Sequence, residues 1–450
     1  MKKNLFFICF LLFVFVNPTD IQFDIEKPIL DEPLMDLTLK DFPEPEIFGV
    51  DKISQVSDEY KNKDAKKNGL KESITEIQTV KIPRPKIQLK SEREKYFNLP
   101  INKEKDGVKE ISICTTLPKT GSASVIGEEI FSGMNLAFNE VNEKGGINGF
   151  TIKLYFYDDK SSFAQATKNI EKLVNDSPLF INLFGLERMY AIEPYMKKGI
   201  AFDLFPVVGS SVVRDMDNPD VIYFRASEKK EIEKLLDYSV KIQNKKAISI
   251  FYERSESGQA TYEYAKNYLK NKYNLDIVSV GSYSEYTVDV LNAIKEITQR
   301  IPSAILCIAD ARATYNFIRR AINSGLHHCL FLGLSPLNVA RETLSKARGV
   351  NVVTSSVVPD PEKSELLIAK EYREDMKKYL PTKKLTRFSF EGYINAQIFI
   401  QVLKDIKGQI TTAKIFESLQ KLKKMKFRGL KIDFGVEPGT LSSEIWLEED

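Results

Sequence analysis

The chain has few of the residues that enzymes most often use for catalysis or metal binding. Its 450 residues include only two histidines, His327 and His328. Neighbouring side chains point apart and no Cys or Asp cluster surrounds this pair, so we expect neither a metal site nor a histidine-dependent catalytic set. The loops Gly-x-Gly-x-x-Gly and Gly-x-x-x-x-Gly-Lys-Ser/Thr are also absent, so a bound dinucleotide or nucleoside triphosphate is unsupported. We therefore predict no enzyme activity, no metal and no cofactor.

Cysteine is scarce and charge is nearly balanced. Outside Cys9, which lies in an apolar N-terminal run, the chain has Cys114, Cys307 and Cys329. An odd set is a poor disulfide framework. Cys307 and Cys329 fall on neighbouring predicted strands but are offset by several residues, whereas a disulfide needs Cα atoms within about 7 Å. We favour buried free thiols. The formal net charge of +3 gives no reason to expect a nucleic-acid partner.

The N-terminus has the pattern of a secretory signal. Met1-Lys-Lys-Asn is followed by an apolar run from Leu5 to Val16. This run is shorter than the roughly 20 apolar residues of a membrane span. We interpret residues 1–19 as a signal peptide and predict a periplasmic or otherwise exported protein. An uncleaved signal anchor stays open as the alternative.

Residues 20–107 have neither helical nor strand periodicity. They are rich in Pro, Lys, Glu and Asp, beginning acidic (Asp41-Phe-Pro-Glu-Pro-Glu46) and ending basic (Lys81-Ile-Pro-Arg-Pro-Lys-Ile87). Such a composition buries too little apolar area to offset the entropy of ordering. We predict a disordered charged tether, with a docking tail for a partner as the alternative.

From Val108 onward, predicted strands alternate with helices of ten to twenty residues. The strands are expected at 110–115, 152–157, 179–184, 205–208, 247–252, 276–281, 304–308, 330–333 and 351–354. The helices are expected at 127–143, 164–175, 257–272, 288–299, 311–324 and 362–379. This alternation indicates an α/β protein with parallel sheets covered by helices on both faces. One series ends near Phe224–Ser227 and a second begins, so we predict two doubly wound lobes.

Five short motifs, in order, resemble one family. A helix ends at Asn142-Glu-Lys-Gly-Gly-Ile-Asn-Gly149 before a strand that closes on Asp158 and Asp159. The others are Phe205-Pro-Val-Val-Gly-Ser-Ser211, Tyr223-Phe-Arg225, Phe390-Glu-Gly-Tyr-Ile-Asn-Ala396 and Phe427-Arg-Gly-Leu-Lys-Ile-Asp-Phe-Gly435. From Val108 to Asp450 the chain resembles the leucine/isoleucine/valine-type periplasmic solute-binding proteins, which have the type I periplasmic-binding fold.

The resemblance implies two lobes built from separate segments, with a ligand cleft between them. Lobe 1 would comprise residues 108–226 plus 355–426, and lobe 2 residues 227–354 plus 427–450. Open α/β sheets independently favour this cleft, because they bind ligands outside the carboxyl ends of their strands.

Carried over by position, several residues on loops at these strand ends become ligand-binding candidates: Gly185, Glu187, Arg188, Gly209, Ser210, Ser211, Ala309, Asp310 and Ser335. The resemblance implies that the amides of Gly209–Ser211 and a hydroxyl there meet a ligand carboxylate. A plain helix cap by Ser211 is the alternative reading of that loop.

Two departures from the family pattern bear on the ligand. Branched-chain binders have a Glu for the ligand ammonium where this chain has Gly333-Leu-Ser335, and Ser or Thr where it has Leu186-Glu-Arg188. A buried ammonium needs a carboxylate. Asp310 is the favoured acceptor over Glu187, which Arg188 neutralises; a simple helix cap is the alternative role for Asp310.

We predict an exported solute-binding protein that captures a small polar ligand, an amino acid or related carboxylate, by lobe closure and presents it to an ABC-type membrane permease. The alternative is an envelope regulator or interaction protein on the same fold, such as an activator of cell-wall synthases. The long tether and the departures at the cleft favour that alternative. An enzyme using Asp158 and Asp159 is the third possibility; solvation of a strand end explains that pair more simply.

Overall fold

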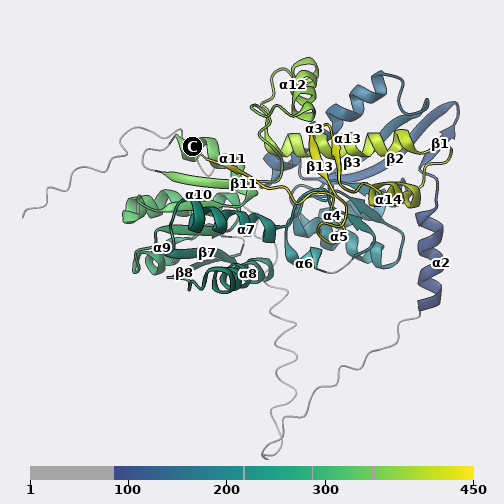
Figure 1. Ribbon diagram of the computed structural model, residues 1–450. Coiled ribbons are helices and arrows are strands. Elements are labelled where there is room, and N and C mark those ends of the chain that lie inside the picture. The colour runs from purple at the N-terminus through teal and green to yellow at the C-terminus, as the bar shows by residue number, and fades with distance from the viewer. Residues whose placement is uncertain (1–85, 216–217, 286, 347–349, 450) are drawn as a thin grey trace, which may run out of the picture. The chain divides into compact units, whose positions relative to one another are not determined.

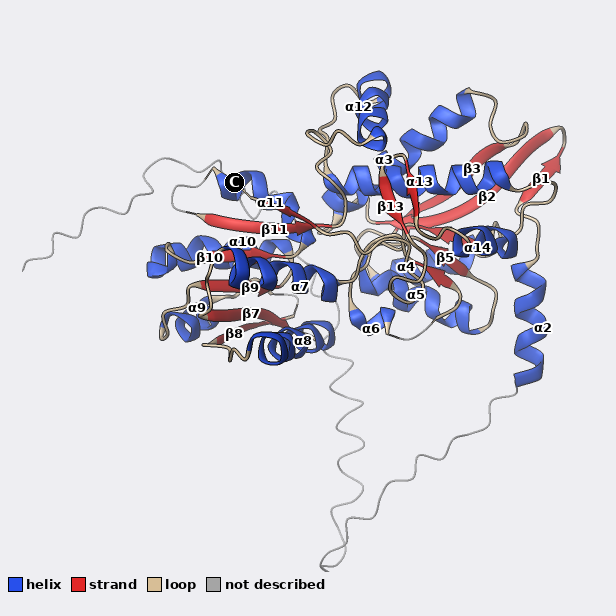
Figure 2. Cartoon of the chain, in the orientation of Figure 1, coloured by secondary structure: helices blue, strands red, loops and turns tan. Residues whose placement is uncertain are grey.

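The computed structural model describes residues 86–449 except 216–217, 286 and 347–349, and these residues form two six-stranded sheets with helices on their faces and one two-stranded hairpin (Figures 1 and 2). The predicted signal peptide and residues 20–85 of the predicted tether lie outside the described residues. We call the two sheets, each with the helices packed on it, the first and second lobes.

The first sheet is parallel except at one edge. Strand β2 lies between β3 and β4, and β5 and β6 follow β4. Strand β1 pairs antiparallel with the start of β2. The strands are β1 (Asn102–Lys105), β2 (Val108–Leu117), β3 (Thr151–Asp158), β4 (Leu179–Ile181), β5 (Phe202–Leu204) and β6 (Val221–Ile222).

The second sheet repeats this arrangement, in the order β14-β11-β10-β9-β7-β8. Among the described strands of this sheet, only β14 is antiparallel. The strands are β7 (Ile248–Arg254), β8 (Val280–Ser284), β9 (Ala304–Ile308), β10 (Leu330–Gly333), β11 (Asn351–Ser356) and β14 (Trp446–Glu448). In both sheets the strand order reverses beside the first strand of the series, at β2/β4 and at β7/β9. Such switch points are where doubly wound sheets bind ligands, next to the carboxyl ends of the strands.

Helices bury both faces of each sheet. On the first lobe, α3 (Ser124–Glu143), α12 (Leu367–Tyr379), α13 (Arg387–Asp405) and α14 (Thr412–Gln420) share one apolar core, and α4 (Phe163–Leu173) and α5 (Gly185–Lys197) share the other. On the second lobe, α9 (Leu291–Thr298), α10 (Ala311–Ala321) and α11 (Asn338–Ser345) cover one face, and α7 (Glu228–Asp237) and α8 (Glu256–Tyr273) the other.

The helices that carry two of the sequence motifs, α3 and α13, meet in one close contact. A Cβ on Gly133 of α3 would lie 1.7 Å from the carbonyl oxygen of Ser389, and one on Gly392 of α13 would lie 2.4 Å from that of Ile130. Only glycine permits such close approach of two backbones. These glycines therefore serve the packing of α3 against α13, which lie side by side in Figure 1.

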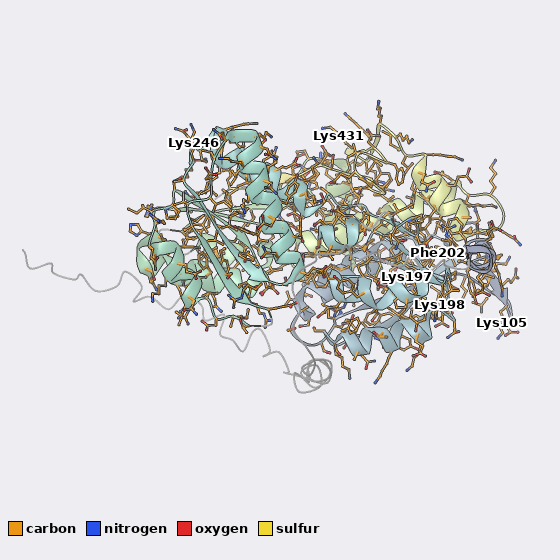
Figure 3. The ribbon with its side chains drawn as sticks, turned by 90° about the horizontal axis from the view of Figure 1, so that it is seen from below. Lys105, Lys197, Lys198, Phe202, Lys246 and Lys431 are labelled. Carbon is orange, nitrogen blue, oxygen red and sulfur yellow. The ribbon has the colours of Figure 1, made fainter. Side chains whose placement is uncertain are left out.

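The N-terminal boundary predicted for the first lobe is wrong. Residues 86–107, expected within the tether, include the helix α2 (Lys86–Phe97) and strand β1. The ring of Phe97 lies 4.9 Å from that of Phe202, which Figure 3 labels beside α2. Nη2 of Arg93 lies 2.7 Å from Oδ1 of Asp220. The ordered part of the first lobe therefore begins before Val108, because these long-range contacts hold α2.

The C-terminal boundary also differs from the prediction. Strands β12 (Met425–Phe427) and β13 (Leu430–Ile432) form a hairpin, and the side chains of Phe427, Leu430 and Leu441 are buried in the core of the first lobe. The tail reaches the second sheet only at β14. The change of lobe thus lies between Leu441 and Trp446 rather than at residue 427.

Most predicted strands lie within a few residues of their observed positions, and those at 304–308 and 330–333 are confirmed exactly. The strand predicted at 205–208 is wrong: it occupies Phe202–Leu204, and Phe205 turns the chain with φ +58°. Cys114, Cys307 and Cys329 are buried free thiols, as predicted. Within the described part of the chain, no helix has the length and apolar character that crossing a membrane requires.

Candidate functional site

The predicted site residues lie on loops that follow strands of the two sheets. Gly185, Glu187 and Arg188 follow β4, and Ala309 and Asp310 follow β9, so both groups adjoin a switch point. Gly209–Ser211 comes after β5 and Ser335 after β10. We describe the loops of the first sheet before those of the second.

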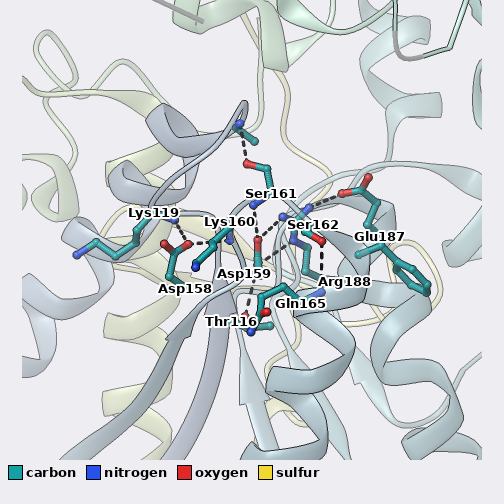
Figure 4. Close-up of polar contacts among 12 residues, drawn as sticks. Thr116, Lys119, Asp158, Asp159, Lys160, Ser161, Ser162, Gln165, Glu187 and Arg188 are labelled. Atoms are coloured by element: carbon teal, nitrogen blue, oxygen red, sulfur yellow. Dashed lines mark hydrogen bonds and ion pairs between the residues drawn. The ribbon is translucent and has the colours of Figure 1, made fainter. Parts of the chain in front are cut away.

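Asp158, at the end of β3, organises the first sheet's loops. Its Oδ1 accepts the N–H groups of Lys119 (2.9 Å) and Lys160 (2.8 Å), and its Oδ2 accepts the hydroxyl of Thr120 (2.7 Å). Partial burial opposes ionisation, but these hydrogen bonds outweigh it and lower the pKa of Asp158. Its carboxylate is thus committed to the fold of the loop (Figure 4).

Asp159 and Arg188 form a buried ion pair beside it. Their side chains are 0% and 3% exposed. Nε of Arg188 donates to Oδ2 of Asp159 at 3.0 Å, and Nη2 donates to Oδ1, so the contact is bidentate (Figure 4). The third donor group, Nη1, lies 2.6 Å from Oε2 of Glu187. Asp159 is therefore a structural counterion, and Arg188 is already paired.

Glu187 and Gly185 stand in the first turn of α5 rather than in a free loop. Burial raises the pKa of Glu187, and the charge of Arg188 opposes that shift. Gly185 has φ +75°, a conformation that glycine adopts without strain. The expected neutralisation of Glu187 by Arg188 agrees with this geometry.

The loop Gly209–Ser211 contacts the second lobe. Oγ of Ser210 lies 2.6 Å from Oγ of Ser257. Ser210, and not Ser211, caps the four-residue helix α6 (Ser211–Arg214), by accepting the N–H of Val212. Gly209 accepts the N–H of Glu228 at 2.9 Å. The hydroxyl of Ser211 has no hydrogen-bond partner among the described residues, so it remains available.

Three groups meet at the carboxyl end of the second sheet. The hydroxyl of Tyr283 lies 2.9 Å from Oε2 of Glu253 and 2.9 Å from Oδ2 of Asp310. Oδ1 of Asp310 accepts the N–H groups of Arg312 (2.7 Å) and Ala313 (3.0 Å), so Asp310 also caps α10. Ala309 supplies only a backbone carbonyl there, which accepts the hydroxyl of Thr314.

The two hydrogen bonds of Tyr283 raise the question of which carboxyl group in this cluster is protonated. Burial raises the pKa of Tyr283, so the phenol keeps its single hydrogen and donates it to only one carboxyl group. The other carboxyl must itself be protonated to bond the phenol oxygen. Burial, with the charges of Asp310 and Glu285, outweighs the hydrogen bond from Tyr283 and raises the pKa of Glu253 to about 7. Near neutral pH, Glu253 therefore carries a proton in about half of the molecules, and this proton can bond the phenol oxygen.

The structure does not bring Ser335 to this group. Its N–H and hydroxyl donate to Glu231, at 2.8 and 3.1 Å, and its hydroxyl also lies 2.6 Å from Nη2 of Arg225. Nη1 of Arg225 also lies 3.7 Å from Oε2 of Glu391. Ser335, Arg225, Glu231 and Glu391 are all buried. They tie together the segments that pass between the lobes, which makes Ser335 a structural residue here.

Sequence reasoning missed Glu253 and Tyr283. Glu253 directly follows the strand predicted at 247–252, and its place at a carboxyl end was the available signal. Tyr283 was hidden because the strand predicted at 276–281 actually runs over Val280–Ser284. Among the described residues, no group of three or more His, Cys, Asp and Glu side chains is placed to hold a metal ion.

Comparisons with known proteins agree on one family. The family described as "Periplasmic binding protein" matches residues 110–447. "Leu/Ile/Val-binding protein homolog 7" of Brucella abortus is 21% identical over 320 residues, covering 66% of this chain and 78% of the relative.

Two solved structures share the fold. The branched-chain amino acid transporter substrate binding protein LivJ from Streptococcus pneumoniae, in complex with isoleucine, has a TM-score of 0.65 at 15% identity, covering 76% of this chain and 96% of that one. A fatty acid ABC transporter substrate-binding protein from Thermomonospora curvata has a TM-score of 0.64 at 17% identity, covering 77% and 90%.

Proposed function

Because the chain belongs to the periplasmic binding protein family, in its leucine/isoleucine/valine-type branch with the type I fold, we propose that it is an exported solute-binding protein for a small ligand with a cationic group. The family consists of substrate-binding proteins rather than enzymes, and it implies a periplasmic location. The ligand is held between the loops of the two sheets, and closure of the lobes presents it to an ABC-type permease.

The cluster of Glu253, Tyr283 and Asp310 is the observation that carries this proposal. An ammonium group has three N–H donors, and the cluster offers two carboxyl groups and a phenol oxygen as acceptors. When Glu253 carries its proton, the two carboxyl groups do not repel each other as two carboxylates would. A ligand cation takes over that role, so its binding releases the proton from Glu253.

The loop Gly209–Ser211 supports a second contact, to a ligand carboxylate. The hydroxyl of Ser211 is free of described partners, and the bond between Ser210 and Ser257 holds this loop against the second lobe. Helix α6 has only four residues, so its N-terminus adds little attraction for an anion. The hydroxyl and the backbone amides are the groups that we assign to this contact.

An amino acid has both charges that these two contacts require. LivJ was solved with isoleucine and the Brucella relative is named for Leu, Ile and Val, whereas the Thermomonospora protein is named for fatty acids, which lack an ammonium group. The fold alone therefore does not select a ligand class. The carboxyl cluster supports the amino-acid class over the fatty-acid class.

The test is a thermal-unfolding screen of the full chain with matched ligands. Leucine, arginine and glutamate sample the side chain, while 4-methylpentanoate lacks the ammonium of leucine and 3-methylbutylamine lacks its carboxylate. A ligand at 100 times its dissociation constant should raise the free energy of unfolding by about 2.7 kcal/mol. We expect ammonium-bearing ligands to stabilise and 4-methylpentanoate not to. Stabilisation by 4-methylpentanoate contradicts the cationic group, and no stabilisation by any small molecule favours the interaction-protein alternative.

A further inference from the structure

Strand β3 lies at the edge of the first sheet and is unusually long for that position. It pairs with β2 over all eight of its residues, in an uninterrupted register from Glu110↔Thr151 to Leu117↔Asp158, and contains no proline. No other described strand pairs with it. The other edge strands of the two sheets, β1, β6, β8 and β14, have only two to five residues. A long, regular edge strand is a template for pairing with another chain, and most proteins shorten, bend or cover such strands.

Asparagine side chains already satisfy backbone groups at both ends of this strand. Nδ2 of Asn142, on α3, donates to the carbonyl of Ile152 at 2.9 Å, and Oδ1 of Asn142 accepts the N–H of Ile152 at 2.8 Å. At the other end, Nδ2 of Asn169, on α4, donates to the carbonyl of Asp158 at 3.1 Å. These paired groups are not free to bond another chain.

Between the two ends, the backbone groups of Leu154 and Phe156 are open. In a parallel strand the N–H and C=O of one residue point to the same side, and those of the next residue point to the opposite side. Because Ile152 bonds Asn142 rather than β2, its groups point away from β2, and those of Leu154 and Phe156 do the same. The edge therefore has two N–H and two C=O groups for which the described residues provide no partner.

We propose that this edge pairs with the same edge of a second copy of the chain, antiparallel, about a two-fold axis at Tyr155. In an antiparallel pair, two opposed residues whose groups point at each other exchange both hydrogen bonds. With the axis at Tyr155, Leu154 faces the partner's Phe156 and Phe156 faces the partner's Leu154. Every open group of both copies is then paired, and the symmetry closes the assembly at two chains.

The blocked groups exclude the neighbouring registers. With the axis at Leu154, Phe156 would face the partner's Ile152, whose N–H and C=O are held by Asn142. With the axis at Phe156, Leu154 would face the partner's Asp158, whose carbonyl is held by Asn169. Each of these registers leaves open groups unpaired. The pattern of open and blocked groups thus matches itself in one register, which favours a second copy over an unrelated extended chain.

The side chains of β3 suit the same register. Tyr155 faces the partner's Tyr155, and Lys153 faces the partner's Tyr157, so no two like charges are opposed between residues 152 and 158. The ring of Tyr157 is 44% exposed and already has a lysine near it, because Nζ of Lys172 lies 5.8 Å from its centroid. Pairing one strand from each copy makes a small interface, so we expect a dimer that forms with rising concentration.

Disulfide trapping on the full chain tests the register. The axis brings the Cα atoms of the two Tyr155 residues to about 4.5 Å, within the range of a disulfide. In a Cys9→Ser background, Tyr155→Cys should form covalent dimers under mild oxidation, since Cys114, Cys307 and Cys329 are buried. Lys153→Cys is the matched control on the same face. Its two thiols would be four strand positions apart, about 13 Å, and should give at least tenfold less dimer. Equal yields from the two variants would contradict the register.

Sedimentation equilibrium over a range of concentrations measures the dimer without a cross-link. Tyr157→Lys sets a new positive charge against the partner's Lys153 and should weaken dimerisation at least tenfold. Adding Lys153→Glu makes the two opposed charges opposite in sign and should restore the dimer. If the unaltered chain stays monomeric and Tyr155→Cys does not cross-link, the proposal is overturned and the edge is left to another extended chain. The ligand screen is unaffected by either result, because the dimer contact involves no ligand.

Discussion

The two sheets share one strand order, yet the loops at their carboxyl ends treat charge differently. After the first sheet, Asp159 and Arg188 are buried, and Asp159 and Glu187 together pair all three donor groups of Arg188. After the second, the phenol of Tyr283 can donate its single hydrogen to only one of Glu253 and Asp310, so a bond to the other requires a proton on that carboxyl group. In the first arrangement all charged groups are paired without a ligand. In the second, a ligand cation can take the place of a proton. Equivalent topological positions therefore serve structure in one lobe and, in our proposal, recognition in the other.

The largest expected effect comes from removing one partner of the buried ion pair between Asp159 and Arg188. Arg188→Met leaves Asp159 buried without a counterion and should lower the free energy of unfolding by about 3–5 kcal/mol. Asp159→Leu combined with Arg188→Met should recover most of that loss, because no buried charge remains. Urea unfolding measures both. Lys197→Met, in a largely exposed pair with Glu193, is the control and should cost less than about 1 kcal/mol. A similarly small cost for Arg188→Met would refute the structural role.

The next effect concerns ligand affinity at the second sheet. For a ligand with an ammonium group, Asp310→Asn should weaken binding by about 2–5 kcal/mol, because a buried cation loses a charged partner. Asparagine caps a helix about as well as aspartate, so α10 should remain folded. Glu187→Gln should cost less, since Arg188 already pairs with Glu187. Isothermal titration compares the two, and a larger loss for Glu187→Gln would reverse the assignment.

Glu253 should make the stability of the ligand-free protein depend on pH. Its pKa is about 7 in the folded chain against an ordinary value of 4.5, so the folded state holds the proton more tightly. This contribution is fully present below pH 4.5 and is lost as the pH rises from 4.5 through about 7, by about 1–3 kcal/mol. Glu253→Gln cannot ionise and should lose less stability over that range. Equal slopes for the variant and the unaltered chain in thermal unfolding would place the proton elsewhere.

The smallest effect is expected at the first sheet. Ser211→Ala should weaken ligand binding by about 0.5–1.5 kcal/mol, the worth of one neutral hydrogen bond. Folding should be unaffected, because the hydroxyl has no partner among the described residues. Ser210→Ala should instead lower stability, since Ser210 caps α6 and contacts Ser257. Unchanged affinity of Ser211→Ala would remove this loop from the site.

Local patterns predicted the elements whose apolar runs are uninterrupted. Strands β9 and β10 are continuous apolar runs and were predicted exactly. Strand β5 was misplaced because Asp203 interrupts it. That carboxyl group is fully buried, burial raises its pKa well above the usual range, and its oxygens have no hydrogen-bond partner among the described residues. No sequence rule expects an unpaired acid inside a strand.

Long-range contacts account for most of the other differences. A helix as short as α2, with 12 residues, is marginal in water, so its contacts with Phe202 and Phe416 decide its presence. The helix cap at Asp310 was foreseen because its backbone partners are within three residues. The hydrogen bonds that hold Ser335 away from the candidate site were not foreseen, because their acceptor Glu231 lies 104 residues earlier in the chain. Sequence patterns therefore locate the loops of the candidate site better than they identify the groups facing it.

The attachment of α2 and β1 decides how the molecule carries mechanical load. A pull on the chain before Lys86 reaches β1, whose register with β2 runs from Asn102↔Ile111 to Lys105↔Val108, and so enters the middle of the first sheet. The backbone bond from the N–H of Ile101 to Ile410, at 2.8 Å, adds a second anchor on the same lobe. The segments that pass between the lobes lie outside this path. Tension applied to the chain before Lys86 would thus act on the first lobe, while the second lobe stays free to move.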